Sequence, residues 1–339
     1  MDFRYTQIQQ DLIEAASAML NGENTLDRLR DLINERKTGQ IAINAQGSGL
    51  SHIWGQFSEV GLLGLMAREA DGGLEQPLVL MAGVAEAAGY VALPEPLIEL
   101  AGIVVPLLSQ MNKPECLTQV LEGRLLVGII TPLLPFNNTT AYHDMFIVTS
   151  EMGGELVLKK DLNLESRKSI DPLRKLAKAN KPSSQNALAD YHGAVLSAAQ
   201  LLGLSKRMID MSCDFAKKRH QFGRPIGSFQ AIKHQLATAY MQIEFTRPMI
   251  QLAALQGGVA VHNAKLTAID TAMLVIETAI QVHGGMGYTY EVDLHLFMKR
   301  AWALCGEWGD RNYHMKKLEE YLLNDEMDIG QIQTFIQEN

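Results

Sequence analysis

The chain has 339 residues, of which 47% are hydrophobic and 20% charged, and its 30 basic and 38 acidic side chains give a formal net charge of −8. This length allows roughly two domains with a large core. The composition excludes a disordered, collagen-like or coiled-coil chain. General nucleic-acid binding is also disfavoured, so a polyanionic ligand would have to meet a local basic cluster.

The cysteines are odd in number and far apart, at Cys116, Cys213 and Cys305, with no Cys-x-x-Cys pair. This spacing predicts neither a disulfide framework nor a structural zinc site. The N-terminus carries Asp2 and alternates apolar with polar residues, and no run reaches the roughly 18 apolar residues that a membrane span needs. We therefore expect a cytoplasmic protein without membrane insertion.

Residues 1–124 read as a helical domain. Apolar residues recur every three or four positions within 5–35, where Asn21-Gly22 breaks the pattern, and further helices are expected from residue 53, over 78–90 and over 97–110. Residues 125–187 form a short β domain, because 125–134, 145–150 and 153–160 are rich in Val, Ile and Thr. The sheet is expected to be confined to roughly 125–165, and the polar segment that follows to be mostly loop.

Residues 188–339 regain a helical period. Apolar stripes step by three and four over 229–243 and 266–280, and with helices at 188–218 and about 291–322 they predict a four-helix bundle. Pro248 is expected to kink or end the second helix.

Common catalytic motifs are absent from the sequence. There is no P-loop, no HExxH zinc helix and no GxSxG elbow, and the glycines at 284–287 follow a predicted helix, which disfavours a Rossmann turn. The nine histidines show no i, i+4 pairing on one helix face, so no metal site is predicted.

Two segments stand out instead. Residues 215–237 gather four positive charges at Lys217, Lys218, Arg219 and Arg224. One interpretation is an ordinary helix C-terminus, where basic residues complement the macrodipole. The other is a ligand loop, in which a guanidinium meets a pyrophosphate and the ring of Phe222 stacks on a base or flavin edge.

The second segment, residues 279–291, contains three glycines after the most regular helix. It is either a helix cap with its turn or a set of free N–H groups facing a phosphate or adenylate. The order of the two segments, about sixty residues apart, is more specific than either alone.

The two segments resemble the acyl-CoA dehydrogenases, the FAD enzymes that introduce an α,β double bond into acyl-CoA thioesters. The likeness extends over nearly the whole chain, with a weaker match at 59–65 and 71–74. Its specific points are Arg219, Gln221, Phe222, Gly223, Pro225, Ile226, Phe229, Gln230, Gln281, Gly284, Gly285, Gly287 and Tyr288. The resemblance implies a mainly α fold with an N-terminal helical domain, a small, truncated middle β domain and a C-terminal four-helix bundle.

In this family, the two segments reach across a dimer interface to the ADP half of the neighbour's FAD. The resemblance therefore implies FAD as cofactor, an acyl-CoA substrate and an electron-transfer acceptor. The cofactor-binding residues that it implies are Arg219, Gln221, Phe222, Gly223, Gln230, Gln281, Gly284 and Gly285.

The sequence departs from the family in two places. The strand that carries the flavin-ring contacts is missing after Thr131-Pro132. The catalytic glutamate is also missing, because the alignment places Trp308 at its position, with Glu307 one residue early, and His192 or Gly193 at the alternative position. A slip of one residue in a helix rotates a side chain by about 100°, so Glu307 is a weak candidate for the base that removes the α-proton.

With these departures, the chain resembles the shortened subunits of bacterial α2β2 acyl-CoA dehydrogenases. Those enzymes often act on steroid or bile-acid side chains. There, one chain supplies the ADP-binding loops and a homologous partner supplies the base. Two alternatives stay open: a self-sufficient homo-oligomeric enzyme that uses Glu307, and a non-catalytic helical oligomer that has lost its flavin.

Overall fold

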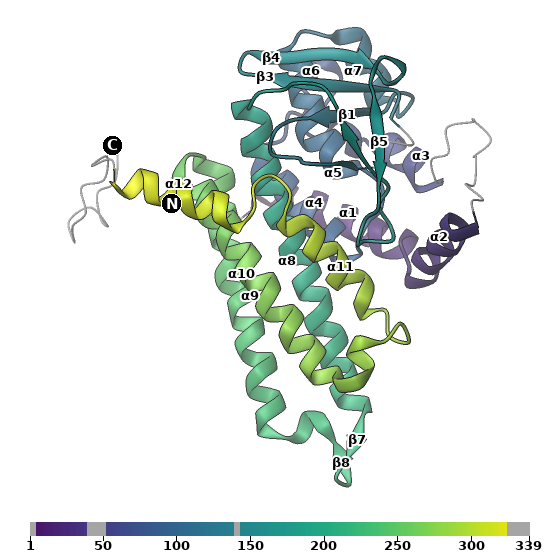
Figure 1. Ribbon diagram of the computed structural model, residues 1–339, viewed down its shortest axis with the longest axis vertical. Helices are drawn as coiled ribbons and strands as arrows, with labels where there is room; N and C mark the ends of the chain where they lie inside the picture. The colour runs from purple at the N-terminus through teal and green to yellow at the C-terminus, as the bar shows by residue number, and fades with distance from the viewer. Residues whose placement is uncertain (1–4, 39–51, 139–142, 324–339) are drawn as a thin grey trace.

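The computed structural model describes residues 5–38, 52–138 and 143–323. Helices dominate, with a small β region at one end of a long bundle (Figure 1). This confirms the expected mainly α fold with a C-terminal bundle. The N-terminal helices are α1 Gln7–Glu23, α2 Leu26–Thr38, α3 His52–Glu59, α4 Leu78–Tyr90, α5 Leu97–Glu99, the π-helical η3 Leu100–Val104, α6 Val105–Gln110 and α7 Pro114–Leu121, with short 3₁₀ turns η1 Leu62–Gly64 and η2 Glu69–Asp71.

The first helix begins with a capping box, in which the Thr6 side chain accepts from the Gln9 amide and the Gln9 side chain accepts from the Thr6 amide. It then continues through Asn21-Gly22 to Glu23, so the helix ends at Asn24, three residues after the start of the predicted break. Asn24 is buried there and donates to the Val91 carbonyl at 2.6 Å.

The β region contains two three-stranded sheets. The first sheet has the order β1-β3-β4, with β1 Val127–Ile130 parallel to β3 Met145–Ser150, and β4 Gly153–Leu158 antiparallel to β3. The second has the order β2-β6-β5, from β2 Asn137–Asn138, β6 Leu176–Ala179 and β5 Leu164–Arg167. The predicted limit at about residue 165 was therefore wrong. The β5–β6 hairpin escaped the pattern because three of the four β5 residues are exposed, which leaves little apolar alternation.

The bundle is formed by α8 Ala187–Lys218, α9 Gln230–Gln256, α10 Val259–His283 and α11 Leu294–Cys305, with α12 Arg311–Leu323 set apart at its upper left in Figure 1. The helix expected over 291–322 is thus two helices, interrupted at residues 306–310, because Trp308 and Gly309 adopt positive φ angles of 57° and 90°. Pro248 does not end α9. It lies on an exposed face, where water can bond the carbonyl that loses its partner.

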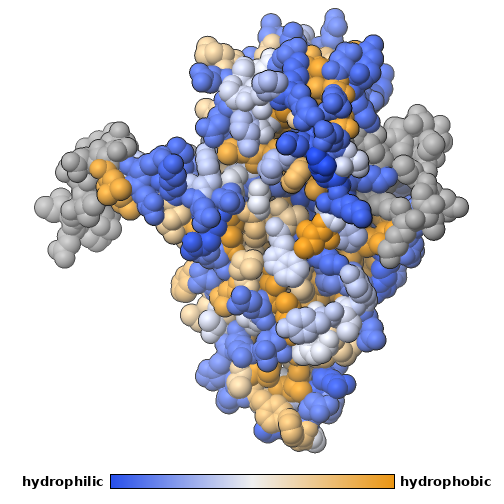
Figure 2. Space-filling model, viewed as in Figure 1, coloured by the Kyte–Doolittle hydropathy of each residue, from blue (hydrophilic) through white to orange (hydrophobic). Residues whose placement is uncertain are grey.

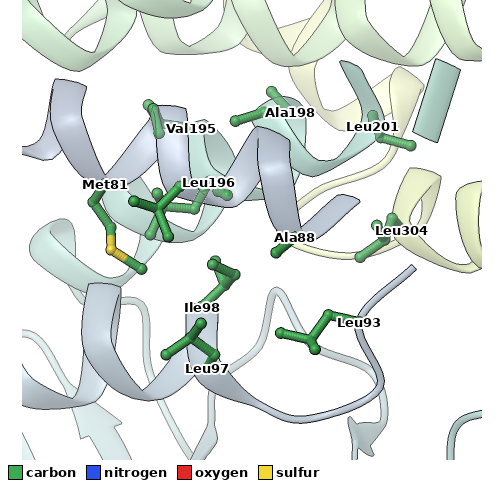
Figure 3. Packing of buried hydrophobic residues seen from close by; sticks show 14 of the residues in the cluster. Met81, Ala88, Leu93, Leu97, Ile98, Val195, Leu196, Ala198, Leu201 and Leu304 are labelled. Atoms are coloured by element: carbon green, nitrogen blue, oxygen red, sulfur yellow. The ribbon is translucent and has the colours of Figure 1, made fainter. Parts of the chain in front are cut away.

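The core joins the N-terminal helices to the bundle where α4 crosses α8. A Cβ atom on Gly203 would lie 1.9 Å from the Glu86 carbonyl oxygen, and one on Gly89 would lie 2.2 Å from that of Gln200. Glycine therefore allows the two backbones to touch. Apolar side chains of α4, α5, α8 and α11 fill the space beside this crossing (Figure 3).

Residues Val259–Tyr288 include an 18-residue window that is long and apolar enough to cross a membrane, and 56% of that window is buried inside the protein. Here the segment packs among the other bundle helices as a core helix. The three cysteines are free thiols, as expected.

Candidate functional site

The basic segment folds into a short hairpin at the lower tip of the molecule (Figure 1). After α8 ends, β7 His220–Gln221 pairs with β8 Arg224–Pro225, followed by the 3₁₀ turn η5 Ile226–Ser228. Phe222 and Gly223 form the turn with φ angles of 53° and 78°. Phe222 is 91% exposed, and Figure 2 shows apolar side chains at this tip.

The cations of the hairpin differ in their surroundings. The Arg224 guanidinium lies 4.2 Å from the Phe229 ring centroid, and Lys217 lies 3.5 Å from an Asp214 carboxylate oxygen. Arg219, the C-cap of α8, is exposed and has no ion-pair partner within the described ranges. An exposed guanidinium without a partner is available to an anionic ligand.

The glycine segment lies at the same end of the bundle. His283, the last residue of α10, stacks on Phe215 of α8 with ring centroids 4.4 Å apart, which places the end of α10 beside the root of the hairpin. Gly284 then takes a φ angle of 59°, as expected for a cap, and the turn η6 Gly284–Tyr288 follows. Gln281 is exposed one turn upstream.

The residues at this end fit the ADP half of a dinucleotide. A Cβ atom added to Gly223, Gly284 or Gly285 would have no neighbour within 4 Å, so backbone is open to a ligand there. The exposed carboxamides of Gln221, Gln230 and Gln281 supply neutral donors and acceptors. Together with the Arg219 guanidinium, the open backbone and these carboxamides are the kinds of group that bind a pyrophosphate and a base.

The turn at residues 306–310, by contrast, makes its contacts with side chains inside the protein. Glu307 forms an ion pair with Arg174 of the β5–β6 loop, and the side chains are only 14% and 4% exposed. The buried ammonium of Lys265 donates to the Leu304 carbonyl at 2.9 Å and to the Ser197 hydroxyl at 2.7 Å, which holds the end of α11. Burial lowers the pKa of Lys265 to about 8.

Trp308 is buried in the same turn and packs directly on α8. A Cβ atom on Gly193 would lie 2.1 Å from the indole Cδ2 atom. The two residues that the alignment placed at the family positions of the catalytic base are thus in contact with each other. His192, beside Gly193, is buried and its Nδ1 lies 2.7 Å from the Gly102 carbonyl oxygen, where burial lowers its pKa.

Helix α8 separates the two regions. Gly193 lies near its first turns and Arg219 caps its end, 26 residues later. At 1.5 Å per residue this is roughly 40 Å. An extended FAD molecule is shorter than this separation, so one FAD cannot meet both Arg219 and the Trp308 turn of one chain.

Sequence reasoning missed the charged side chains around Glu307. Arg300 is buried, forms an ion pair with Asp171, and donates from Nη1 to the Leu93 carbonyl at 2.7 Å. Glu99 is half-buried, and desolvation, together with the negative charge of Glu307, raises its pKa to about 8. These residues come from segments that read as loop or as apolar helix, and no local motif marks them.

A histidine pair was missed as well, because its members are 52 residues apart in the sequence. The Nδ1 atoms of His262 and His314 are 3.0 Å apart, and His314 Nε2 lies 3.0 Å from the Trp308 carbonyl oxygen. His314 Nε2–H therefore donates to Trp308, and its Nδ1 accepts from His262. Burial lowers the pKa of His314 to about 4, so the pair is neutral at pH 7. The described residues contain no cluster of metal-ligating side chains.

Comparison with known proteins places these features in a family. Residues 188–321 match the family model described as "Acyl-CoA dehydrogenase, C-terminal domain". The acyl-CoA dehydrogenase IpdE2 of Mycolicibacterium smegmatis is 30% identical over 277 residues, which cover 79% of this chain and 87% of that protein.

Two solved structures share the fold. The ChsE4-ChsE5 complex from Mycobacterium tuberculosis has a chain that superposes with a TM-score of 0.81 at 20% identity, covering 96% of this chain and all (100%) of that one. The Tcur3481-Tcur3483 steroid ACAD gives a TM-score of 0.74 at 22% identity, covering 94% and 98%. The extent of the match to IpdE2 shows that this chain belongs to the acyl-CoA dehydrogenase family of flavoprotein oxidoreductases.

Proposed function

We propose that this chain is the accessory subunit of a heteromeric, α2β2 acyl-CoA dehydrogenase that acts on acyl-CoA thioesters from lipid or steroid degradation. Its hairpin and glycine loop bind the ADP half of FAD, and a homologous partner supplies the flavin-ring pocket and the catalytic base. FAD, when bound, accepts the hydride from the β-carbon of the acyl group.

The observation that carries this proposal is the pairing of Glu307 with Arg174. A general base must be within hydrogen-bond reach of the proton that it removes, and its pKa is best near the working pH. In this chain the Arg174 guanidinium already holds one carboxylate oxygen of Glu307, and the Glu307 side chain is only 14% exposed, which leaves little access for an acyl group. This disfavours the self-sufficient alternative, in which Glu307 removes the α-proton.

The position of the cofactor loops supports a role across an interface. Arg219, Phe222 and Gln281 are exposed at the tip, roughly 40 Å along α8 from Trp308. If these loops hold the ADP half of FAD, the flavin ring would have to be received by a second subunit. Two relatives of similar fold are named as two-component assemblies, ChsE4-ChsE5 and Tcur3481-Tcur3483.

An exposed apolar stripe on α9 gives the partner a surface. The stripe consists of exposed Met241, Phe245, Pro248 and Leu255 with half-buried Leu252, at spacings of four, three, four and three, and Phe245 is 62% exposed. Such a stripe faces one side of a helix and is typical of an association surface. An obligate second subunit accounts for its exposure in the single chain.

Flavin content tests the proposal. The chain is purified alone and with a co-expressed full-length homologue, and the flavin absorbance per subunit is measured. We expect little flavin in the chain alone and stoichiometric FAD with dehydrogenase activity in the complex. A yellow, active protein without a partner would establish the homomeric enzyme, and absence of flavin in every assembly would establish the non-catalytic oligomer.

A further inference from the structure

Two cavities share Trp308 as part of their walls. The inner one has a volume of about 50 Å³ and is bounded by Glu99, Arg174, Arg300 and Glu307, with an apolar side that includes Leu93, Ile98, Leu196 and Leu304 (Figure 3). The outer one, of about 210 Å³, is bounded by polar side chains that include Asp190, Tyr191 and His262. Within the described part of the chain, Trp308 is the one residue that lines both.

Trp308 is held in place at three points, two on its backbone and one on its ring. The Trp308 amide donates to the Leu133 carbonyl at 2.9 Å, and the Trp308 carbonyl accepts from His314, which the His262 ring supports in turn. At the third point the ring lies against Gly193, where no larger residue fits. Trp308 accepts a φ angle of 57°, which is unfavourable for a bulky residue, to reach this position.

The inner cavity behind the indole is small and charged. Arg174 Nε and Arg300 Nη2 are buried there and have no hydrogen-bond partner among the described residues. The ion pairs to Glu307 and Asp171 use the other guanidinium atoms, and the raised pKa of Glu99 leaves its carboxyl group mainly protonated at pH 7. A space of about 50 Å³ with such donors holds one or two water molecules, and no acyl chain.

We propose that Trp308 is a plug between these two cavities, which leaves this chain no room for an acyl group beside Glu307. The indole stands between the outer pocket and the charged inner cavity, so a ligand in the outer pocket does not reach Glu307. This inference rests on the proposed accessory role and extends it, because it names the residue that makes this subunit non-catalytic. Removal of the indole joins the two cavities into a space that takes a planar aromatic molecule of indole size.

The test uses Trp308→Gly, because glycine keeps the positive φ angle without strain and retains both backbone hydrogen bonds. We expect millimolar indole to raise the melting temperature of this variant by several degrees and to leave the wild-type protein unchanged, since a ligand that binds only the folded state stabilises it. Trp302→Ala on α11 is the matched control, for which indole should have no effect.

A double-mutant cycle provides a second measurement. Gly193→Ala should lower the melting temperature strongly in the wild-type background, because its Cβ would overlap the indole, and only weakly in the Trp308→Gly background. If Trp308→Gly fails to fold, Trp308→Leu replaces it, with the same non-additivity expected. Absence of an indole effect, or an equal cost of Gly193→Ala in both backgrounds, would overturn the plug.

The number of acyl-CoA molecules bound by the assembled enzyme tests whether the plug keeps acyl-CoA out of this chain. An acyl-CoA thioether should bind once per pair of subunits in the wild-type complex. Two molecules per pair would mean that the cavity of this chain is open, and would overturn the inference. The indole and double-mutant measurements use this chain alone, so a failure of the plug is distinguishable from a failure of the accessory role, which flavin content reports.

Discussion

Charged side chains have opposite surroundings at the two ends of α8. At the Arg219 end, a guanidinium, carboxamides and glycine backbone are exposed, and Arg219 has no ion-pair partner in the described ranges. At the Gly193 end, Arg174 and Arg300 are buried and Glu307 is half-buried, all three are in ion pairs, and they line one cavity with the Trp308 indole. An exposed set of unpaired donors is suited to an external anion, whereas a buried, neutralised set stabilises a closed structure. The comparison teaches that the same kinds of charged side chain are left accessible at one end of the helix and neutralised inside the protein at the other.

We call the Arg219 end of α8 the open end and the Gly193 end the closed end. The largest effect is expected at the closed end, where Arg174→Met leaves Glu307 without its cation. Loss of one partner of a buried pair typically costs about 3–5 kcal/mol, because the remaining charge stays desolvated. We expect a matching fall in the free energy of urea unfolding, measured by circular dichroism. The control is Arg167→Met, whose exposed pair with Glu165 should contribute less than about 1 kcal/mol. Equal effects of the two variants would show that the Arg174–Glu307 pair is no more desolvated than an exposed ion pair.

The pH dependence of stability provides a second test of the closed end, through Glu99. Its folded-state pKa of about 8 lies above the usual 4.5, so between these values the unfolded chain releases a proton that the folded chain keeps. This contribution to stability is fully present below pH 4.5, falls as pH rises and levels off above pH 8, a loss on the order of a few kcal/mol. Glu99→Gln should therefore flatten the dependence of the unfolding free energy on pH between 5 and 8.

Parallel pH profiles for the wild-type protein and Glu99→Gln would place Glu99 in contact with water. That result would remove the contrast between the two ends of α8. The conservative amide keeps the size of the side chain, so a change in packing does not account for a difference in slope.

The sequence marked out the residues of the open end, whose role in cofactor binding stays a prediction, and gave no sign of the closed end. Arg219, Phe222, Gln281 and Gly284 stand in contiguous loops, so local motifs reveal them. The closed end is assembled from four distant segments: Glu99, the Arg174 loop, Arg300 and the Glu307 turn. Their pairing depends on tertiary contact and leaves no local spacing.

The same reason explains the errors in the fold. Long amphipathic helices carry their period in sequence, and α9 and α10 were predicted. The break at Trp308 and the β5–β6 hairpin depend on contacts with Gly193 and Arg300, which no periodicity records. The missing flavin-ring strand remains a prediction, since part of that segment, 139–142, lies outside the described residues.

The open end is tested by Arg219→Ala in the assembled enzyme. A charge-assisted hydrogen bond from a guanidinium to a pyrophosphate contributes about 1.5–3 kcal/mol, so the affinity for FAD should fall roughly ten- to a hundredfold. Phe222→Ala should act in the same direction with a smaller effect. Titration of the apo-complex with FAD measures both. If Arg219→Ala leaves the affinity unchanged, the basic segment is only a helix terminus.

The smallest effect is expected from Glu307→Gln, and it decides whether the closed end has any catalytic role. Glutamine keeps the size of the side chain and accepts a hydrogen bond from Arg174, so the turn should persist. Removal of a general base typically lowers a rate by about 10²–10⁴-fold. If Glu307 only pairs with Arg174, the turnover of the FAD-loaded complex should fall by less than about tenfold, and Asp310→Asn should be equally mild. Stopped-flow reduction of the flavin by acyl-CoA measures this step directly. A thousandfold loss with FAD still bound would make this chain the catalytic subunit and would erase the division between the two ends of α8.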